Sequence, residues 1–499
     1  MRMSNHYSGS VTFVCNPDLS CIGGMMSSQR VHVSSSWLFH ISKSSLTMLL
    51  LIIVTELISV GYVTLYSSGK PSLHRPVPKP AREHPMGTVP MQYATPHDQN
   101  SQNHCDIKGV KSWKNGMVTL LQPRIEANCT ALRTGDEREI GTVKKRIQTW
   151  VNAESDETFL KTLSNCSHIV EEYSSNFYVS PEEENFPLAY ILVVYTNVRQ
   201  VLRLLKVIYR PHNLYCIHPD AKRPAVVRSF QTVSHCLRNV FVASKLERVY
   251  YAHHTIMDAQ LNCMQDLMGY NPSRWRYIIN LCGRELPLKT NREIVRSLMK
   301  LNGYSAIDSF EVPEANKHRL VNKFVLSAGV VKRTRKKLGP VPYGIRFYKS
   351  MTYIAVSRPF VSFLLTSKIS IALRKYLKDA KVPEEHFYSS LYELPGVPGG
   401  RPLKKGTVMP IVDAYAWMNS NDAKLHPQKL CKGRIVHSIC ILSSGDLPMV
   451  YSKGVNARRP TFFFNKYFME WDHVVMDCME QRLVEQNMLE YKQDCSVYT

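Results

Sequence analysis

"LAYILVVYTNVRQVLRLLKVIYRPHNLYCIHPD", residues 188–220, decides the fold of this chain. Its first eight residues are an uninterrupted apolar run, which is typical of a strand buried on both faces. The apolar residues of the following stretch, residues 198–209, recur at helical spacing, and residues 214–220 form a second apolar run. A strand, a helix and a strand within about thirty residues predict a βαβ unit with two parallel strands.

The same alternation continues along the chain. Residues 239–244 and 276–281 are further apolar runs with strand character, and residues 256–268 between them have helical spacing. We therefore expect an α/β fold with a mostly parallel sheet that is covered by helices on both faces.

Polar residues follow two of these strands, at the edge where such sheets bind ligands. Asp220 follows the second strand, and Arg284 and Glu285 follow the fourth, so they are either ligand contacts or ordinary loop residues. The sequence has no phosphate-binding G-x-x-x-x-G-K-[ST], no G-x-G-x-x-G after the first strand and no G-x-S-x-G elbow. It also has no Asp-x-Asp pair to hold a divalent metal. A bound diphosphate would therefore rely on lysine or arginine.

The N-terminal part of the sequence indicates membrane attachment. Residues 46–65 form an apolar run long enough to span a bilayer, with Glu56 as its one acid. A long stretch precedes the run, which argues against a cleaved signal peptide, and a buried core helix is the remaining alternative. We expect a cytoplasmic tail (1–45), a transmembrane signal anchor (46–66), a Pro-, His-, Ser- and Gln-rich stem (67–125) and a folded domain (126–499).

Cysteines and glycosylation signals place the folded domain in an oxidising lumen. Most of the 13 cysteines follow the apolar run, and none forms a C-x-x-C pair. Asn128 and Asn165 each begin an N-glycosylation sequon. The formal net charge of +23 favours an anionic partner, and a lumenal domain argues against nucleic acid as that partner.

"KVPEEHFYSSL", residues 381–391, predicts the start of a helix. Proline suits the first turn, and acids there are stabilised by the unpaired amides, so Glu384 and Glu385 both suit a helix start and Glu385 by itself is an ordinary solvated helix-start acid. The helix would bury Phe387, Leu391 and Leu394 and end at Pro395.

Several blocks of sequence occur in an order that resembles one enzyme family. They are "NLYCIHPDAK", "NVFVASKLERVYYA", "LNCMQDL", "YIINLCGRELPLKTNREIV", "PEEHFYSSL" with "PGVPG", and "ICILSSGDL". Over roughly residues 126–483 the chain resembles the β-1,6-N-acetylglucosaminyltransferases that make core 2 and I branches, glycosyltransferase family fourteen. This resemblance implies a GT-A glycosyltransferase fold with a Rossmann-like nucleotide-binding half.

The resemblance also implies a reaction. It is the inverting transfer of N-acetylglucosamine from UDP-GlcNAc to the 6-hydroxyl of an O-glycan, Galβ1-3GalNAc for core 2, without a metal or other cofactor. The expected partners are UDP-GlcNAc and an O-glycosylated glycoprotein, and the expected location is the Golgi membrane, as a single-pass type II protein with a lumenal catalytic domain. The alternatives are I branching of polylactosamine and a glycan-binding homologue that has lost turnover.

The family's disulfides imply a pairing of the cysteines. The pairs are Cys129–Cys478, Cys166–Cys236, Cys216–Cys263 and Cys431–Cys440. Cys282 would be free. Cys105 and Cys495 have no counterpart in the family and either pair with each other or link two chains as a homodimer.

Individual site residues follow from the resemblance as well. Donor-binding positions correspond to Val193, Asp220, Tyr251, His437 and Lys466. Acceptor-binding positions correspond to Asp308, Lys317, Arg319 and Trp417. Glu385 matches the catalytic base, which takes the proton of the attacking hydroxyl, and Glu384 keeps the helix-start role. Without the resemblance, Lys466 reads as a surface lysine among aromatic residues.

One departure from the family concerns the diphosphate. His437 stands where the family has an arginine, and histidine is only partly charged near neutral pH and forms no bidentate fork. Arg434, Arg458 or Arg459 could substitute for the missing guanidinium.

Other departures concern the sugars. Ser350 and Met351 stand where the family has small residues and would crowd the donor sugar. Asp308 is one methylene shorter than the family's glutamate, and Asn419 replaces a tyrosine, so the choice of acceptor could differ.

"KRTRKKLG", residues 332–339, concentrates five basic residues. It is either a solvated loop or a segment that attracts sialylated or sulfated glycoprotein.

Overall fold

The chain divides into two units, Met1–His97 and Asp98–Thr499, and the residues that the structure describes all lie in the second. The computed structural model describes residues 127–149, 155–163, 165–174, 177–270, 275–402, 431–436, 439–455 and 461–495. The predicted tail, membrane anchor and stem lie outside these ranges. Among the described helices, none combines the length and the apolar character needed to cross a membrane.

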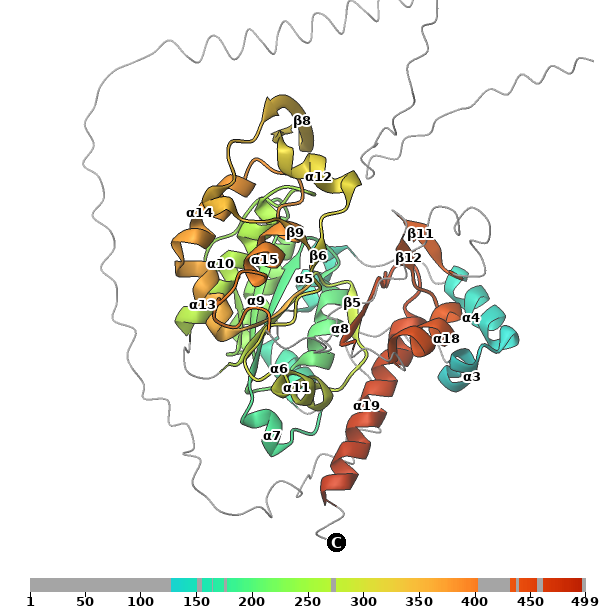
Figure 1. Ribbon diagram of the computed structural model, residues 1–499. Coiled ribbons are helices and arrows are strands. Elements are labelled where there is room, and N and C mark those ends of the chain that lie inside the picture. Colours follow the sequence, from blue (N-terminus) through green and yellow to red (C-terminus); the bar gives the residue numbers. More distant parts are fainter. Residues whose placement is uncertain are drawn as a thin grey trace, which may run out of the picture. The chain divides into compact units, whose positions relative to one another are not determined.

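A five-stranded sheet forms the centre of the second unit (Figure 1). Its strands, in spatial order, are β10 (Ala355–Ser357), β4 (Tyr277–Leu281), β1 (Leu188–Val194), β2 (Leu214–Pro219) and β3 (Val240–Val242). The three pairings from β4 to β3 are parallel, and β10 runs antiparallel to β4. The prediction of an α/β fold with a mostly parallel sheet is confirmed.

Helices cover both faces of this sheet. Alternate residues of β1 enter two separate apolar clusters, with Tyr190 and Leu192 in one and Ala189 and Ile191 in the other. The first cluster includes α8 (Val198–Ile208), α9 (Pro224–Cys236), α11 (Asn291–Met299) and α19 (Val474–Cys495). The second includes α10 (Thr255–Tyr270), α13 (Arg358–Thr366), α14 (Lys368–Leu377) and α15 (Glu384–Tyr392). Burial on both faces explains why the strands are continuous apolar runs.

The strand order reverses between β1 and β4. The chain proceeds from β1 to β2 and β3 on one side and then returns to place β4 on the other side. The carboxyl ends of strands at such a reversal are where open α/β sheets bind ligands. Gly283, directly after β4, has a φ of +83°, and a Cβ there would lie 2.7 Å from Val201 Cγ2 of α8. Glycine is therefore required for α8 and the end of β4 to pack this closely.

Short strand pairs extend the unit beyond the sheet. They are β5 (Glu285–Pro287) with β13 (Phe463–Asn465), β6 (Phe310–Glu311) with β9 (Tyr348–Lys349), β7 (Asn322–Ser327) with β8 (Val330–Lys337), and β11 (Arg434–Val436) with β12 (Ile439–Ile441). The remaining helices include α3 (Cys129–Thr134), α4 (Glu137–Thr149), α5 (Asp156–Thr162), α6 (Cys166–Ser174), α7 (Pro181–Glu184), α12 (Glu314–Val321) and α18 (Leu447–Val450).

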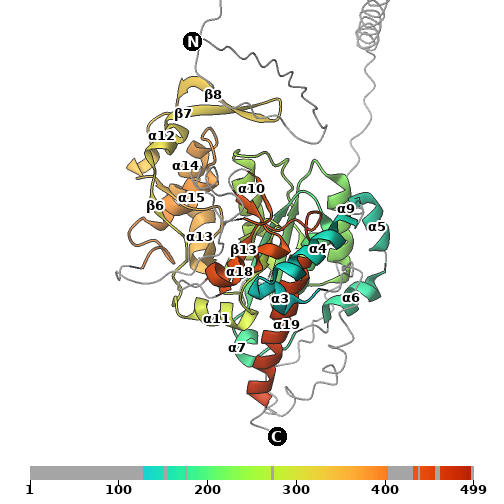
Figure 2. The same cartoon turned by 90° about the vertical axis from the view of Figure 1, so that its right-hand side faces the viewer.

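One sequence expectation is corrected by the β7–β8 pair. The solvated-loop alternative for residues 332–339 is wrong, because most of this segment is strand β8. The chain reverses at Ala328 and Gly329, whose φ values of 49° and 77° are those of a two-residue hairpin turn. Figure 2 shows the hairpin at one end of the described unit, beyond α12.

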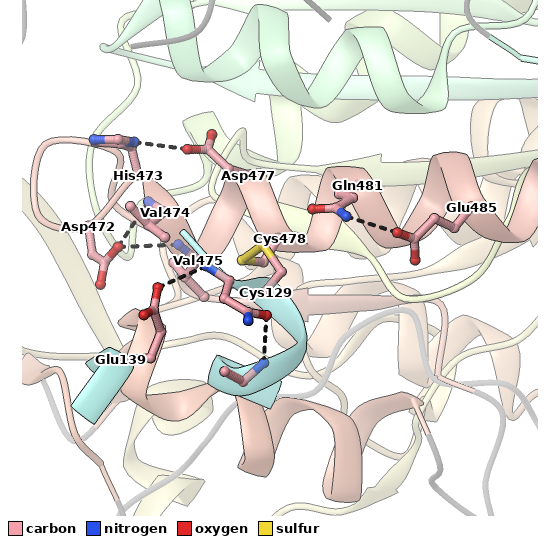
Figure 3. Close-up of a disulfide and its surroundings, with 12 residues drawn as sticks. Cys129, Glu139, Asp472, His473, Val474, Val475, Asp477, Cys478, Gln481 and Glu485 are labelled. Atoms are coloured by element: carbon pink, nitrogen blue, oxygen red, sulfur yellow. Dashed lines mark hydrogen bonds and ion pairs between the residues drawn. A yellow bond between two sulfur atoms is a disulfide. The ribbon is translucent and has the colours of Figure 1, made fainter. Parts of the chain in front are cut away.

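Four disulfides tie distant elements together. They are Cys129–Cys478, Cys166–Cys236, Cys216–Cys263 and Cys431–Cys440, the pairs that the resemblance implied. Figure 3 shows the first of them, between α3 and the start of α19, where Asp472 accepts hydrogen bonds from the amides of Val474 and Val475. Cys282 is the free cysteine of the described residues. Cys495 is also disulfide-bonded.

Candidate active site

Two strand ends and one loop bring together Val193, Asp220 and Tyr251, which we call the strand-end group. Val193 lies next to last in β1, and Asp220 directly follows β2, the neighbouring strand. The Asp220 carboxylate accepts hydrogen bonds from the amides of Lys222 (2.9 Å) and Val249 (3.3 Å). Tyr251, on the same loop as Val249, is 81% exposed and therefore free to cover a ligand at this edge.

Lys222 holds the loop that carries Val249 and Tyr251. Its ammonium lies 3.2 Å from the Asp220 carboxylate and 4.0 Å from the ring centroid of Tyr250, and it donates to the carbonyl of Val249. One buried acid and one lysine thus hold the segment that carries Tyr251.

The first turn of α15 carries a second cluster, the α15 group, made of Glu385, Arg319 and Lys349. One oxygen of the Glu385 carboxylate lies 3.0 Å from Arg319 Nη1 and 3.0 Å from Lys349 Nζ. The Glu385 side chain is 22% exposed, so solvent and ligands can reach it. Two cations therefore hold the carboxylate, and each of them can also turn toward a sugar hydroxyl.

Lys349 reaches Glu385 because β9 packs on the start of α15. The Tyr348 carbonyl accepts hydrogen bonds from His386 Nδ1 and Ser389 Oγ, both 3.0 Å. The Ser350 amide donates to the Glu385 carbonyl at 2.7 Å. Lys349 was not identified from the sequence, and nothing local marks it, because its role depends on this long-range packing.

A short segment before α15 joins the two groups. The Val382 amide donates to the Ala252 carbonyl at 2.9 Å, and Ala252 directly follows Tyr251. The neighbouring Lys381 amide donates to the Arg319 carbonyl at 3.2 Å. The strand-end group and the α15 group therefore border one common region.

A buried carboxylate, Glu285, organises a third cluster after β4. It accepts from the amides of Cys282 (3.0 Å) and Arg284 (3.1 Å) and from Asn465 Nδ2 (3.1 Å), and the Tyr353 hydroxyl donates to it as well. Burial raises the pKa of the Cys282 thiol, and the adjacent Glu285 raises it further. The sequence singled out Arg284 and Glu285 as strand-end residues, and the structure makes Glu285 a support for its neighbours.

Lys466 directly follows Asn465 of this cluster. Its carbonyl accepts from the Leu442 amide at 2.9 Å, which places Lys466 beside the end of β12. Its ammonium lies 5.6 Å from the ring centroid of Phe468. Arg434, on β11, stacks its guanidinium at 5.5 Å over Trp471. His437, Arg458 and Arg459 lie outside the described residues.

The segment from Lys349 to Tyr353 connects the Glu285 cluster to the α15 group. Four residues span at most about 14 Å even when fully extended, so the two clusters are neighbours. Asp308 belongs to a chain segment that runs alongside, because Ala306 pairs with Ala355 and Phe310 pairs with Lys349. Asp308 is thereby brought next to the α15 group.

Glu384 begins α15, as predicted, and the structure adds that its side chain is buried, at 4% exposed. Burial raises the pKa of its carboxyl to about 8, and the neighbouring Glu385 contributes to the increase. Glu384 lies three and seven residues before Phe387 and Leu391, on the buried side of the helix, and this spacing was a sequence signal for its burial.

Of the predicted acceptor residues that the structure describes, Lys317 is not brought to Glu385. Lys317 is exposed and forms an ion pair with Glu314, 2.6 Å away on its own helix. Trp417 and Asn419 lie outside the described residues. Asn128 and Asn165 are both exposed, which is what glycosylation requires.

The described residues contain one grouping of possible metal ligands, Cys431, Cys440 and Asp446. The two cysteines are disulfide-bonded to each other, so neither offers a thiolate. The Asp446 carboxylate accepts from the amides of Lys432 (2.6 Å) and Gly433 (2.9 Å). This grouping therefore holds the segment before β11 against the segment after β12.

Comparisons with known proteins identify the family of this chain. The profile of the family described as Core-2/I-Branching enzyme matches residues 188–449. A zebrafish (Danio rerio) protein named beta-1,3-galactosyl-O-glycosyl-glycoprotein beta-1,6-N-acetylglucosaminyltransferase 4 is 31% identical over 377 residues, 74% of this chain and 86% of that protein. A human protein with the same name but no number is 31% identical, over 72% of this chain and 86% of its own length.

A second kind of relative matches a shorter stretch with higher identity. The mouse N-acetyllactosaminide beta-1,6-N-acetylglucosaminyl-transferase is 35% identical over 315 residues, 62% of this chain and 76% of that protein. The family profile covers more than half of the chain, and the relatives match over most of their own length. The chain therefore belongs to the Core-2/I-Branching enzyme family.

Proposed function

We propose that this chain transfers N-acetylglucosamine from UDP-GlcNAc to the 6-hydroxyl of an O-glycan acceptor, Galβ1-3GalNAc, and so makes core 2 branches. The single observation that carries the proposal is the position of Glu385. Its carboxylate is reachable by solvent and is held by two cations, and it closely follows the segment that joins the α15 group to the strand-end group.

Glu385 acts as the base in this proposal. An alcohol becomes a good nucleophile when a carboxylate within hydrogen-bond reach takes its proton. The acceptor oxygen forms a bond to the anomeric carbon of N-acetylglucosamine from the face opposite UDP, and UDP leaves with the bonding electron pair. One displacement of this kind inverts the anomeric centre. Arg319 and Lys349 then stabilise Glu385 before the acceptor arrives and orient the hydroxyl afterwards.

The strand-end group binds the nucleotide in this proposal. Asp220 and Val193 receive the uridine and ribose, and exposed Tyr251 covers them. Lys466 and His437 neutralise the diphosphate, which supports the leaving group without a metal ion or other cofactor. The absence of an Asp-x-Asp pair from the sequence agrees with this assignment.

In this proposal the acceptor approaches Glu385 from the side opposite the donor. Arg319 is already in place beside Glu385, and Asp308 and Trp417 complete the proposed acceptor contacts. Lys317, which is paired with Glu314, is left out of them. Ser350 donates its amide and hydroxyl hydrogen bonds to the Glu385 carbonyl. In this proposal Ser350 helps to fix the base, and Met351 is the residue that would crowd the donor sugar.

The proposed setting is the Golgi membrane, with residues 46–66 as a type II anchor and the catalytic domain in the lumen. The four disulfides and the two exposed sequon asparagines support a lumenal position.

The test uses the full-length chain with labelled UDP-GlcNAc, a panel of O-glycan acceptors, and chelator. We expect transfer to Galβ1-3GalNAc at an unchanged rate in chelator, lost in Glu385→Gln and kept in Glu311→Gln, a control at an exposed acid. A requirement for manganese would contradict the mechanism. Acceptor binding without any transfer would instead support a glycan-binding homologue that has lost turnover.

One observation favours a second acceptor. The mouse relative with 35% identity is named for N-acetyllactosaminide, so polylactosamine is the alternative substrate and I branching the alternative product. The same panel decides between the two acceptors by their kcat/KM values.

A further inference from the structure

The β7–β8 hairpin concentrates positive charge that the proposed reaction does not use. Its second strand carries five exposed cations in eight residues, Lys332, Arg333, Arg335, Lys336 and Lys337. No carboxylate of a described residue forms an ion pair with any of the five; the nearby acids Asp379 and Glu314 are paired with Lys323 and Lys317 instead. The charge of this strand is thus left for an external partner.

Two of these cations have a structural role in the hairpin. Arg333 Nη2 and Lys337 Nζ both donate to Oδ1 of buried Asn322, at 3.3 and 3.2 Å. Phe324, opposite Arg333, is buried, and its amide donates to the Asp379 carbonyl at 2.7 Å. This face of the hairpin therefore anchors it to the rest of the unit.

The other three cations are free of such contacts. Lys332 lies opposite Val325, which is 49% exposed, so this pair marks the outer face. Between residues 333 and 337 the pairing is irregular, and a β-bulge of this kind re-aims the side chains it contains. Arg335 and Lys336 lie in this irregular stretch and are exposed.

The hairpin runs alongside the candidate active site from one group to the other. Its base continues directly from α12, which carries Arg319 of the α15 group. Its tip reaches the strand-end side, because a Cβ at Gly329 would lie 3.8 Å from Cε1 of Tyr250. A glycan whose hydroxyl reaches Glu385 must continue away from the reaction centre, and the hairpin lines one such path.

We propose that the outer face of the β7–β8 hairpin binds carboxylate or sulfate groups carried by the acceptor glycan beyond the sugar that receives N-acetylglucosamine. The proposal rests on the proposed function, since it names a property of the acceptor. Carboxylate in sialic acid and ester sulfate share the anionic chemistry that lysine and arginine recognise. The position of the cations beside the reaction centre favours an acceptor glycan over a membrane surface as their partner.

The first experiment measures KM on the full-length chain for one acceptor in neutral, sialylated and sulfated forms. We expect a KM about tenfold lower for at least one charged form than for the neutral form, because three exposed contacts each contribute modestly. The advantage should shrink as salt rises from about 0.05 to about 0.2 M, because exposed charges are screened. The two charged forms show which anion is preferred.

The decisive variant is Lys332→Gln/Arg335→Gln/Lys336→Gln, which leaves Arg333 and Lys337 to hold Asn322. We expect it to raise KM for the charged acceptor about tenfold and KM for the neutral acceptor less than about twofold. The matched control is Arg138→Gln/Lys144→Gln/Lys145→Gln on exposed α4, which removes the same charge and should leave both KM values unchanged.

Other outcomes separate this proposal from the proposed function. Equal KM values for charged and neutral acceptors, or equal effects of the hairpin and control variants, overturn the hairpin proposal while the transferase activity stands. If no acceptor is glycosylated, the proposed function fails, and direct binding of the same immobilised glycans decides the hairpin. If the hairpin variant loses this binding and the control variant keeps it, the proposal is supported. Binding to anionic lipid vesicles alone, without binding to any of these glycans, overturns it.

Discussion

The strand-end group and the α15 group differ in how their charged residues are held. Asp220 lies at the end of a sheet strand and receives hydrogen bonds from its own loop and the next one. Arg319, Lys349 and Glu385 come from α12, β9 and α15, three separate elements, and their side chains meet at 3.0 Å. A site fixed by strand ends is set by local sequence, whereas a site joined from three elements depends on how those elements pack.

The comparison predicts a division of labour that kinetics can test. Changes in the α15 group should alter the rate of transfer, and changes beside the strand-end group should alter donor use.

The largest effect is expected for Glu385→Gln. Glutamine keeps the shape of the side chain but accepts no proton, so the transfer rate should fall about a thousandfold, within the range typical of a lost general base. Initial rates at saturating donor and acceptor measure this. The KM for UDP-GlcNAc and the melting temperature should stay close to wild type. A rate within about tenfold of wild type would remove Glu385 as the base.

The next effect concerns stability, and it separates Glu384 from Glu385. The pKa of Glu384 is raised from 4.5 to about 8 by burial, so the folded chain binds this proton more tightly than the unfolded chain. The stability that this group contributes is present below about pH 4.5 and is lost as pH rises through about 8, by about 3 kcal/mol between pH 5 and pH 8.

Glu384→Gln should remove that loss, because glutamine does not titrate. Its melting temperature relative to wild type should therefore increase from pH 5 to pH 8, whereas exposed Glu311→Gln should follow wild type at both pH values. If the melting temperatures of wild type and Glu384→Gln changed with pH in parallel, Glu384 would not be protonated in the folded chain.

Lys466→Ala tests the donor side of the comparison. Loss of a charge that neutralises the diphosphate should lower kcat/KM for UDP-GlcNAc about a hundredfold and leave the KM for the acceptor unchanged. Lys466→Arg retains the charge and should recover most of the loss. An unchanged donor kcat/KM in Lys466→Ala would assign diphosphate binding to other residues.

The smallest effect is expected for Lys349→Gln. It removes one of the two cations at the Glu385 carboxylate while Arg319 remains, so the transfer rate should fall about tenfold. Lys349→Arg serves as the control with conserved charge. If Lys349→Gln raised only the KM for UDP-GlcNAc, Lys349 would belong to the donor side and the comparison between the two groups would have to be redrawn.

Sequence reasoning identified the elements that depend on neighbours along the chain. The apolar runs at residues 188–195 and 214–220 became β1 and β2 with nearly the same limits, and the polar residue after β2 became part of the site. Sequence reasoning failed for the basic segment at residues 332–339. Its high charge suggested a solvated loop, but contacts with Phe324 and Asn322 on the partner strand make the segment part of strand β8.

The two acids at the start of α15 show the same limit of sequence reasoning for single residues. Consecutive helical residues point about 100° apart, so one of two adjacent acids can face the core while the other faces the site. The i, i+3, i+7 spacing of Glu384 with Phe387 and Leu391 indicated which one is buried, although the helix-start chemistry concealed it. No comparable spacing marks Lys349, because β9 reaches α15 from another part of the chain.

The sequence by itself determined the α/β class, the order of strands and helices and the family resemblance, because periodicity and ordered blocks are properties of neighbouring residues. The tertiary structure decided the rest. It buried Glu384 and raised its pKa, brought Lys349 and Arg319 to Glu385, gathered Cys282, Tyr353 and Asn465 around Glu285, and set the basic hairpin beside the site. Each of these depends on contacts between residues far apart in the chain, which hydrophobic packing brings together and local sequence does not encode.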